Sequence, residues 1–178
     1  MFVSDCPKFG YDVLCPNLLS REEPYDYNDE DIAYRNFVGM GFVQFAETAR
    51  AILRQLRSVY RTLYVVGYSV GATTAWLCSV EPGLIDAFVG YYGSRIRDYL
   101  DVHPQCPALL LFPQEEPFFD VDELVAKLRG KFNVDVRKYD RRHGFADLQN
   151  KNYSELASKK SFEDTIRFIM HSRRSQGC

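Results

Sequence analysis

The stretch Val66-Gly67-Tyr68-Ser69-Val70-Gly71 decides the fold, because it sets a Gly-x-Ser-x-Gly pattern between an apolar run and a stretch with helical spacing. The pattern predicts a tight turn from a β-strand into an α-helix, with the Ser69 hydroxyl raised above the carboxyl edge of a sheet. Such a strained turn requires small residues two positions before and after the serine, and Gly67 and Gly71 meet that requirement. Ser69 is therefore a candidate nucleophile. In the alternative interpretation, the glycines only allow close packing of helix on strand, and Ser69 is an ordinary helix cap.

Short apolar runs alternate with longer helical patterns along the chain, which favours an α/β fold with a mostly parallel sheet. The expected strands are Tyr11–Cys15, Leu63–Tyr68, Ala87–Tyr92, Ala108–Phe112 and Val134–Tyr139. The expected helices are Phe37–Leu56, Val70–Ser79, Val121–Lys131 and Ser161–His171. Nearly continuous apolar strands are typical of a sheet covered by helices on both faces. We further expect Asp120 to cap the third helix and Ser20–Asp31 to be a surface excursion.

Length and composition predict a single globular domain over residues 1–178. A chain of 178 residues with 46% hydrophobic and 26% charged residues is close to globular averages, and folding can bury about 70% of its unfolded surface. The formal net charge is −2, from 22 basic and 24 acidic residues, and the basic residues are scattered. Because phosphate binding needs clustered positive charge, we expect no nucleic-acid partner.

Cysteine usage and the lack of long apolar runs predict a cytoplasmic protein. The five cysteines are widely separated and form no C-x-x-C pair, so we expect reduced thiols, with Cys78 and Cys106 buried and inert. The first residues lack the basic flank and apolar core of a signal peptide, and no apolar run approaches the ~20 residues that cross a bilayer. We therefore expect no membrane association. The sequence does not indicate an oligomeric state.

Three histidines compete for the role of general base to Ser69. His143 follows the last expected strand in a polar loop, from which it can reach the carboxyl edge of the sheet. His103 precedes a strand and so belongs to the opposite edge, and His171 lies at the end of the last expected helix. We therefore predict that His143 is the base.

A carboxylate that orients the imidazole is expected between the fourth expected strand and His143. Glu115, Glu116, Asp120 and Asp122 all lie in this interval. Glu116, in a short loop, is the preferred candidate. Asp120 is the second, because its position is better explained as a helix cap.

The resulting order along the chain is nucleophile, acid and base, which is the order found in α/β hydrolases. The backbone N–H of Val70 is expected to donate to the oxyanion that forms when Ser69 attacks a carbonyl group. Four aromatic residues flank the expected site and are candidates for an apolar acyl pocket: Tyr68, Tyr92, Phe118 and Phe145.

From about residue 5 to the C-terminal helix, the chain resembles the dienelactone hydrolase family of the α/β hydrolases. Besides the stretch around Ser69, the resemblance is carried by Gly90-Tyr91-Tyr92-Gly93, by His143-Gly144-Phe145 and by Gly10-Tyr11-Asp12-Val13-Leu14-Cys15-Pro16-Asn17-Leu18. The last of these corresponds to a strand and loop that usually end in Pro-Asp-Leu in the family. The resemblance implies an α/β-hydrolase fold and a hydrolytic activity.

Two departures from the family pattern bear on the substrate. Founding members of the family use cysteine as the nucleophile, whereas this chain has Ser69, and many relatives with serine resemble general esterases. Members that hold a substrate carboxylate use two arginines; Arg21 matches the first, but Asp147 stands in place of the second. Because an aspartate repels a carboxylate, hydrolysis of dienelactone itself is not expected. Arg21 has an alternative interpretation as a surface residue paired with a neighbouring glutamate.

A third departure is that the family normally has two or three strands ahead of the position of Met1. They include a strand between the Tyr11 and Leu63 strands, and the loop after it supplies the second oxyanion N–H. We therefore expect either direct pairing of the Tyr11 and Leu63 strands or an added strand from outside the 178 residues. The chain is interpreted either as part of a longer protein or as a naturally shortened member.

The sequence thus predicts a serine hydrolase that cleaves a small carboxylic ester or lactone through an acyl-enzyme, with Ser69, Glu116 and His143 as the triad. No metal or organic cofactor is required for this chemistry. One alternative is a non-catalytic α/β-hydrolase-like module that binds a ligand or a partner. Another is a thioesterase or peptidase on the same scaffold, since a fold does not dictate a reaction.

Overall fold

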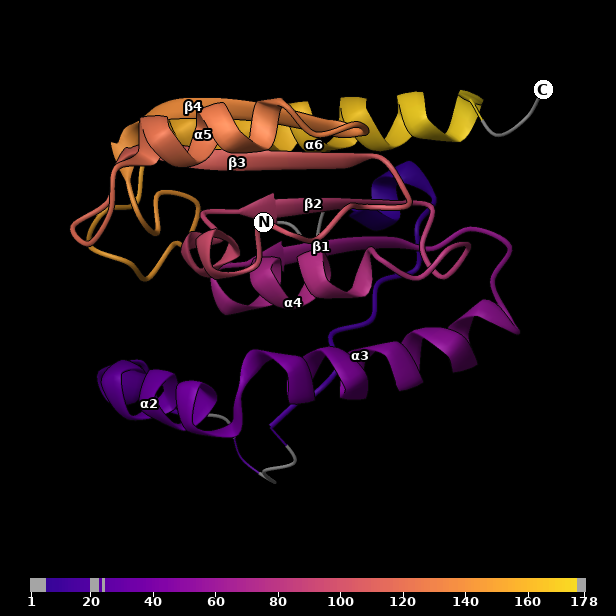
Figure 1. Cartoon of the computed structure of the whole chain (residues 1–178), viewed down its shortest axis with the longest axis horizontal. Helices are drawn as coiled ribbons and strands as arrows, with labels where there is room; N and C mark the ends of the chain where they lie inside the picture. Colours follow the sequence, from indigo (N-terminus) through magenta and orange to yellow (C-terminus); the bar gives the residue numbers. More distant parts are fainter. Residues whose placement is uncertain (1–5, 20–22, 24, 176–178) are drawn as a thin grey trace.

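The computed structural model describes residues 6–19, 23 and 25–175. Its centre is a four-stranded sheet made of β1 (Tyr64–Tyr68), β2 (Ala87–Tyr91), β3 (Ala108–Glu115) and β4 (Val134–Arg142). All three strand pairs are parallel, and the order in space, β1-β2-β3-β4, is the order in the sequence. The sequence predicted these four strands, and their carboxyl ends lie together at one edge of the sheet (Figure 1).

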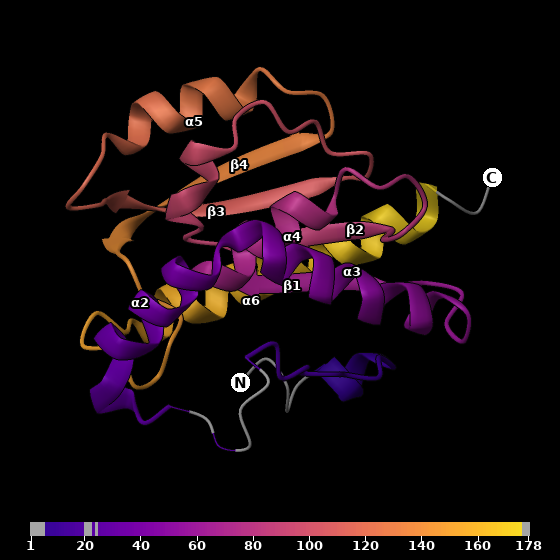
Figure 2. The same cartoon turned by 60° about the horizontal axis from the view of Figure 1, so that its bottom comes forward.

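The connections between successive strands pack on one face of the sheet. Because crossover connections between parallel strands are right-handed, a sheet that grows in one direction receives its connecting helices on one face. Helices α4 (Val70–Cys78) and α5 (Val121–Arg129) lie on this face, as Figure 2 shows. Trp76 of α4 and Leu128 of α5 are fully buried there, in one cluster with Phe88 of β2.

The opposite face of the sheet is covered by α6 (Glu155–Ser175). Ile169 of this helix packs in a second cluster with Val89 of β2 and Leu109 of β3. Because neighbouring residues along β2 and β3 point to opposite faces, these strands are buried on both sides, which explains their nearly continuous apolar sequence.

The expected long helix Phe37–Leu56 is in fact two helices, so this prediction is wrong. Helix α2 (Glu30–Met40) ends at Gly41, and α3 (Phe42–Arg57) begins directly after it. Gly41 has φ +84°, a conformation that glycine adopts without strain and that no helix continues through. The apolar spacing in the sequence continues across this break. In the structure the two helices contact each other there, because the rings of Phe37 and Phe45 pack together with centroids 4.3 Å apart.

Helix α3 lies over α4 rather than directly on the sheet. Phe42 and Ala46 of α3 form a buried cluster with Leu77 and Cys78 of α4. The other helix bounds differ from the prediction mainly at α6, which begins six residues earlier than the expected Ser161 start.

The predicted strand Tyr11–Cys15 is absent, and so is its pairing with the Leu63 strand. These residues have no regular secondary structure, and among the described residues β1 pairs with β2 alone. A strand inserted in a parallel sheet buries both faces, whereas Val13 and Leu14 are 36% and 59% exposed. The segment still contacts the sheet, because the Tyr11 ring packs edge-on against Tyr64 at 6.0 Å.

Part of the expected surface excursion Ser20–Asp31 lies outside the described residues. Its last residues form the short turn Tyr27–Asp29 and the start of α2. None of the described helices is both long enough and apolar enough to cross a membrane.

The N-terminus of α5 provides a test of the predicted cap. The Asp120 carboxylate accepts hydrogen bonds from the backbone N–H groups of Asp122 and Glu123, at 2.8 and 3.2 Å. We expect Asp120→Ala to lower the free energy of unfolding in urea by about 1 kcal/mol, because these N–H groups lose their acceptor. Glu123→Ala, which removes an exposed ion pair with Lys127, should cost no more than about 0.5 kcal/mol. Equal losses in the two variants would contradict the capping role.

Candidate active site

Ser69 lies in a strained turn between the end of β1 and the start of α4. Its φ and ψ are 51° and −111°, in a region that residues other than glycine rarely adopt. The backbone holds this conformation through the Ser69 N–H, which donates to the Tyr91 carbonyl at 2.9 Å, and through the Ser69 carbonyl, which accepts from Ala72 and Thr73. The predicted strand-to-helix turn at Ser69 is therefore present.

Only one of the two glycines around Ser69 is required by close packing. A Cβ atom on Gly67 would lie 2.3 Å from the carbonyl oxygen of Gly71, which is far inside contact distance. A Cβ atom on Gly71 would meet nothing within 4 Å. The requirement for a small residue two positions after Ser69 is thus not seen in this structure.

His143 and Glu116 lie within hydrogen-bond distance of each other and form a chain with Ser69. His143 Nε2 is 3.1 Å from Ser69 Oγ, and His143 Nδ1 is 2.7 Å from Glu116 Oε1. The ladder between β3 and β4 ends at the pair Glu115 and Arg142, so the next residues, Glu116 and His143, emerge side by side. The Glu116 side chain is only 5% exposed, whereas that of His143 is 30% exposed. A buried carboxylate therefore holds an imidazole that solvent can still reach.

The competing candidates have other places in the structure. Asp120 caps α5, as described above. His171 lies on the outer surface of α6, and His103 precedes β3 and so belongs to the amino end of the sheet. Glu116 and His143 are thus the carboxylate and the imidazole that the geometry brings to Ser69.

The loop after His143 contains a contact that sequence reasoning missed. Asn152 Nδ2 donates to the His143 carbonyl oxygen at 2.8 Å, which ties the loop back to its own beginning. Gly144, with φ +83°, makes this return possible, since a Cβ atom there would collide with the Asn150 side chain at 2.4 Å. The signal available in the sequence was the concentration of Asn and Asp residues, which is typical of such turns.

One of the four predicted pocket aromatics, Tyr92, lies beside His143, and Tyr68 packs against its neighbour Tyr91. The Tyr92 ring is 4.7 Å from the imidazole of His143, centroid to centroid, and Tyr92 is only 3% exposed. The Tyr68 ring stacks on Tyr91 at 4.5 Å, and burial raises the pKa of the Tyr68 hydroxyl far above its ordinary value.

Phe145 and Phe118 do not have the surroundings expected of pocket-lining residues. Phe145 has no exposed surface and packs against Tyr139 at 5.1 Å, so it is a core residue rather than a pocket lining. Phe118 is 86% exposed and points into solvent from the loop after Glu116. Arg21 lies outside the described residues.

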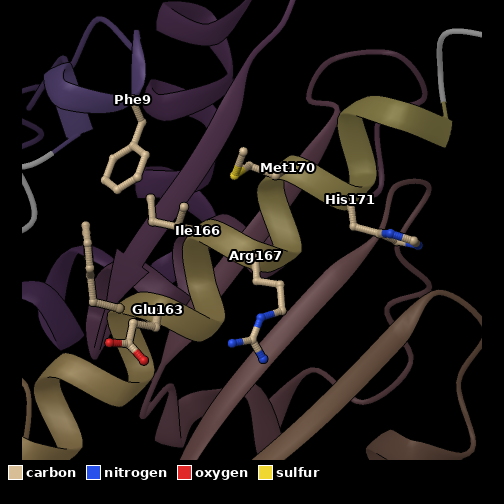
Figure 3. A pocket seen from close by; sticks show the side chains of 7 residues that line it. Phe9, Glu163, Ile166, Arg167, Met170 and His171 are labelled. Atoms are coloured by element: carbon tan, nitrogen blue, oxygen red, sulfur yellow. The ribbon is translucent and has the colours of Figure 1, made fainter.

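Ser69 lines neither of two surface hollows found in the described part of the chain. The larger, of about 480 Å³, lies against the outer side of α6 (Figure 3) and is lined by Phe9, Phe162, Glu163, Ile166, Arg167, Met170 and His171. The smaller, of about 360 Å³, lies beside the His143 loop and is lined by Gln114, Glu115, Asp140, Arg141, Arg142 and Asn152.

The thiols near the core are poorly suited to nucleophilic chemistry. Burial raises the pKa of Cys78 to about 11 and that of Cys106 to about 12, so both are protonated at neutral pH. Over the described ranges, no three His, Cys, Asp or Glu side chains gather in an arrangement that could hold a metal ion.

The unequal surroundings of the two glycines give a test of the turn. We expect Gly67→Ala to lower the free energy of unfolding by about 3 kcal/mol or more, because the new methyl group meets backbone that cannot move independently. Gly71→Ala should be neutral or stabilising by up to about 1 kcal/mol, since the position is helical and open. Similar stability of the two variants in thermal and urea denaturation would contradict this account of the turn.

Comparison with known proteins agrees with the fold and identifies the family. The model of the dienelactone hydrolase family matches residues 3–172. A Bacillus subtilis (strain 168) protein, described as the uncharacterized protein YczH, is 45% identical over 141 residues, which cover 78% of this chain and 68% of that protein.

A crystal structure assigned to the dienelactone hydrolases, from Klebsiella pneumoniae subsp. pneumoniae MGH 78578, matches with a TM-score of 0.65 and 15% identity over 83% of this chain and 68% of that one. The crystal structure of the dienelactone hydrolase-like promiscuous phosphotriesterase P91 from metagenomic libraries matches with a TM-score of 0.72 and 15% identity. This match covers 93% of this chain and 77% of that one. The chain therefore belongs to the dienelactone hydrolase family and has an α/β-hydrolase fold, which the described residues build around a four-stranded parallel sheet.

Proposed function

We propose that this chain is a serine hydrolase that cleaves a small carboxylic ester or lactone, with Ser69 as nucleophile, His143 as base and Glu116 as the orienting acid. The observation that carries the proposal is the continuous hydrogen-bond chain from Ser69 Oγ through the imidazole to a buried carboxylate. Membership of a hydrolase family supports it.

Each member of the triad has a defined step in the proposed reaction. Glu116 accepts the Nδ1 hydrogen of His143, which leaves Nε2 unprotonated and directed at the Ser69 hydroxyl. His143 takes the hydroxyl proton as Ser69 Oγ attacks the carbonyl carbon, and it then gives this proton to the departing alkoxide. Water repeats the sequence on the acyl-enzyme and releases the acid, so the enzyme returns to its starting state.

The start of α4 supports the negative charge that develops on the carbonyl oxygen. Val70 is the first residue of this helix, and the first N–H groups of a helix have no acceptor within it. Its N–H, together with the positive end of the helix dipole, is the proposed oxyanion donor.

The loop after His143 bears on which esters the site accepts. Asp147 lies four residues after His143, and its carboxylate accepts a hydrogen bond from the Gln149 N–H at 3.0 Å within this loop. Since a fixed negative charge repels a second one, we propose that uncharged esters are preferred over esters that carry a carboxylate.

The catalytic proposal predicts large and selective losses of activity. With p-nitrophenyl butyrate as substrate, we expect Ser69→Ala and His143→Ala to lower kcat by at least about 10³-fold and Glu116→Gln by about 10²- to 10⁴-fold, while the variants stay folded. Asp120→Ala is the matched carboxylate control, because this side chain caps α5 instead of contacting His143. Its kcat should stay close to that of the wild type. Activity that survives in Ser69→Ala would contradict Ser69 as nucleophile.

The same assay separates the proposal from its alternatives. A folded wild-type protein that hydrolyses no ester, thioester or peptide favours a ligand-binding module. Hydrolysis of thioesters or peptides in clear preference to oxygen esters favours the other reactions on this scaffold.

The charge proposal predicts a change in substrate preference. Between p-nitrophenyl butyrate and the mono-p-nitrophenyl ester of succinate, which differ by a terminal carboxylate, wild type should favour the butyrate. We expect Asp147→Asn to raise the succinate-to-butyrate ratio of kcat/KM about three-fold at low salt, and we expect less change at high salt. Asparagine retains the acceptor for Gln149, so the loop is kept. An unchanged ratio would contradict a role for Asp147 in selection.

A further inference from the structure

The four strands each place one residue at the carboxyl edge, and three of these four belong to the proposed triad. Ser69 follows β1, Glu116 follows β3 and His143 follows β4. The residue in the corresponding position after β2 is Tyr92. We propose that Tyr92 is a positioning residue, whose ring supports one face of the His143 imidazole and holds it in line with Ser69. This inference rests on the proposed function of the triad.

Two hydrogen bonds alone leave the imidazole one free motion. The hydrogen-bonding groups of an imidazole lie in its ring plane, and those of His143 are occupied by Glu116 at Nδ1 and by Ser69 at Nε2. The ring can therefore rock about the line that joins the two nitrogens, which turns the Nδ1–H bond and the Nε2 lone pair out of line with Glu116 and Ser69. A contact on the face of the ring is what stops this motion. The Tyr92 ring lies against the imidazole, tilted by 49° with 4.7 Å between the centroids, and in this proposal it is the contact that limits the motion.

The Tyr92 ring is itself held rigidly. Its backbone has φ +41°, a conformation that costs free energy in a residue other than glycine and so needs support from its surroundings. The support comes from two hydrogen bonds: Tyr92 N–H donates to Leu111 O at 2.7 Å, and Ser94 N–H donates to Tyr92 O at 2.8 Å. The ring also packs edge-on against the buried Phe145, with centroids 5.4 Å apart.

The chemistry of the contact suits both protonation states of His143. An aromatic face attracts a cation, so it stabilises the imidazolium that exists while Ser69 attacks, and it does not compete for either ring nitrogen. The charged side chain that is hydrogen-bonded to the imidazole belongs to Glu116, directly after β3. Arg142 is the last residue of β4 and directly precedes His143. Its side chain is 74% exposed, and its Nε atom lies 3.8 Å from Glu115 Oε2. The uncharged Ser69 and Tyr92 face the imidazole from the ends of β1 and β2.

The test compares variants of Tyr92 that keep or lose an aromatic face. Tyr92→Phe keeps the face, and Tyr92→Leu removes it while filling most of the space; Tyr92→Met is a second variant if the leucine protein does not fold. Phe88→Leu is the matched control, because Phe88 is a fully buried aromatic residue of β2, the strand that Tyr92 follows, and it packs on the opposite face of the sheet. All variants are assayed with p-nitrophenyl butyrate, and their thermal stabilities are measured.

We expect Tyr92→Leu to lower kcat about ten-fold with KM changed less than about two-fold, because a tilted base misaligns proton transfer without touching the substrate. Tyr92→Phe should keep kcat within about two-fold of wild type, and so should Phe88→Leu despite its lost core packing. A loss in Tyr92→Phe as large as that in Tyr92→Leu would overturn the inference, since it would assign the effect to the hydroxyl group. A change in KM alone would overturn it in favour of a substrate contact.

A second readout does not depend on catalysis. The proton shared by His143 Nδ1 and Glu116 should give a far-downfield 1H NMR signal, identified by its absence in His143→Ala. The signal should persist in wild type, Tyr92→Phe and Phe88→Leu and broaden or vanish in Tyr92→Leu. If it is unchanged in Tyr92→Leu, the positioning role is wrong. If wild type shows the signal but hydrolyses nothing, the proposed function fails while the inference about Tyr92 is still decided.

Discussion

The close approach of β1 to the start of α4 is the constraint on which the site depends. Gly67 lets the carbonyl of Gly71 pass within a distance that excludes any side chain. That approach bends the chain sharply enough to hold Ser69 at a positive φ, with its N–H bonded to the next strand. The strain of such a conformation is on the order of 1–3 kcal/mol, and the pairing of β1 with β2 and the first turn of α4 offset it. The Ser69 hydroxyl is thereby fixed by backbone geometry before any side chain contributes.

The parallel sheet then assembles the remaining parts of the site in a regular way. Because all strands run in one direction and follow each other in order, their carboxyl ends form a single edge. The first residue after each strand lies on that edge, in the sequence Ser69, Tyr92, Glu116 and His143. His143 reaches back across the edge from β4 to Ser69 at β1, and Glu116 and Tyr92 lie along its path. The fold therefore supplies the order of the site, and the loops supply the fine adjustment, as Asn152 does at the His143 carbonyl.

The sequence predicted those features whose cause is local. Apolar runs indicated five strands, of which β1, β2, β3 and β4 are present, and the Gly-x-Ser-x-Gly pattern indicated the turn at Ser69. Features that depend on tertiary packing were missed. The break at Gly41 is hidden because the apolar spacing continues across it, and the run Tyr11–Cys15 has strand composition but lies outside the sheet. Tyr92 was predicted to contact substrate, because spacing alone does not reveal that its ring faces the imidazole.

The central claim is that Ser69 is an activated nucleophile, and covalent labelling tests it most directly. The folded protein is treated with a fluorophosphonate and analysed by intact and peptide mass spectrometry, with Ser69→Ala and His143→Ala as controls. The account predicts a single adduct on the peptide that contains Ser69, absent in Ser69→Ala and strongly reduced in His143→Ala. A folded protein without an adduct, or an adduct on another residue, would contradict it.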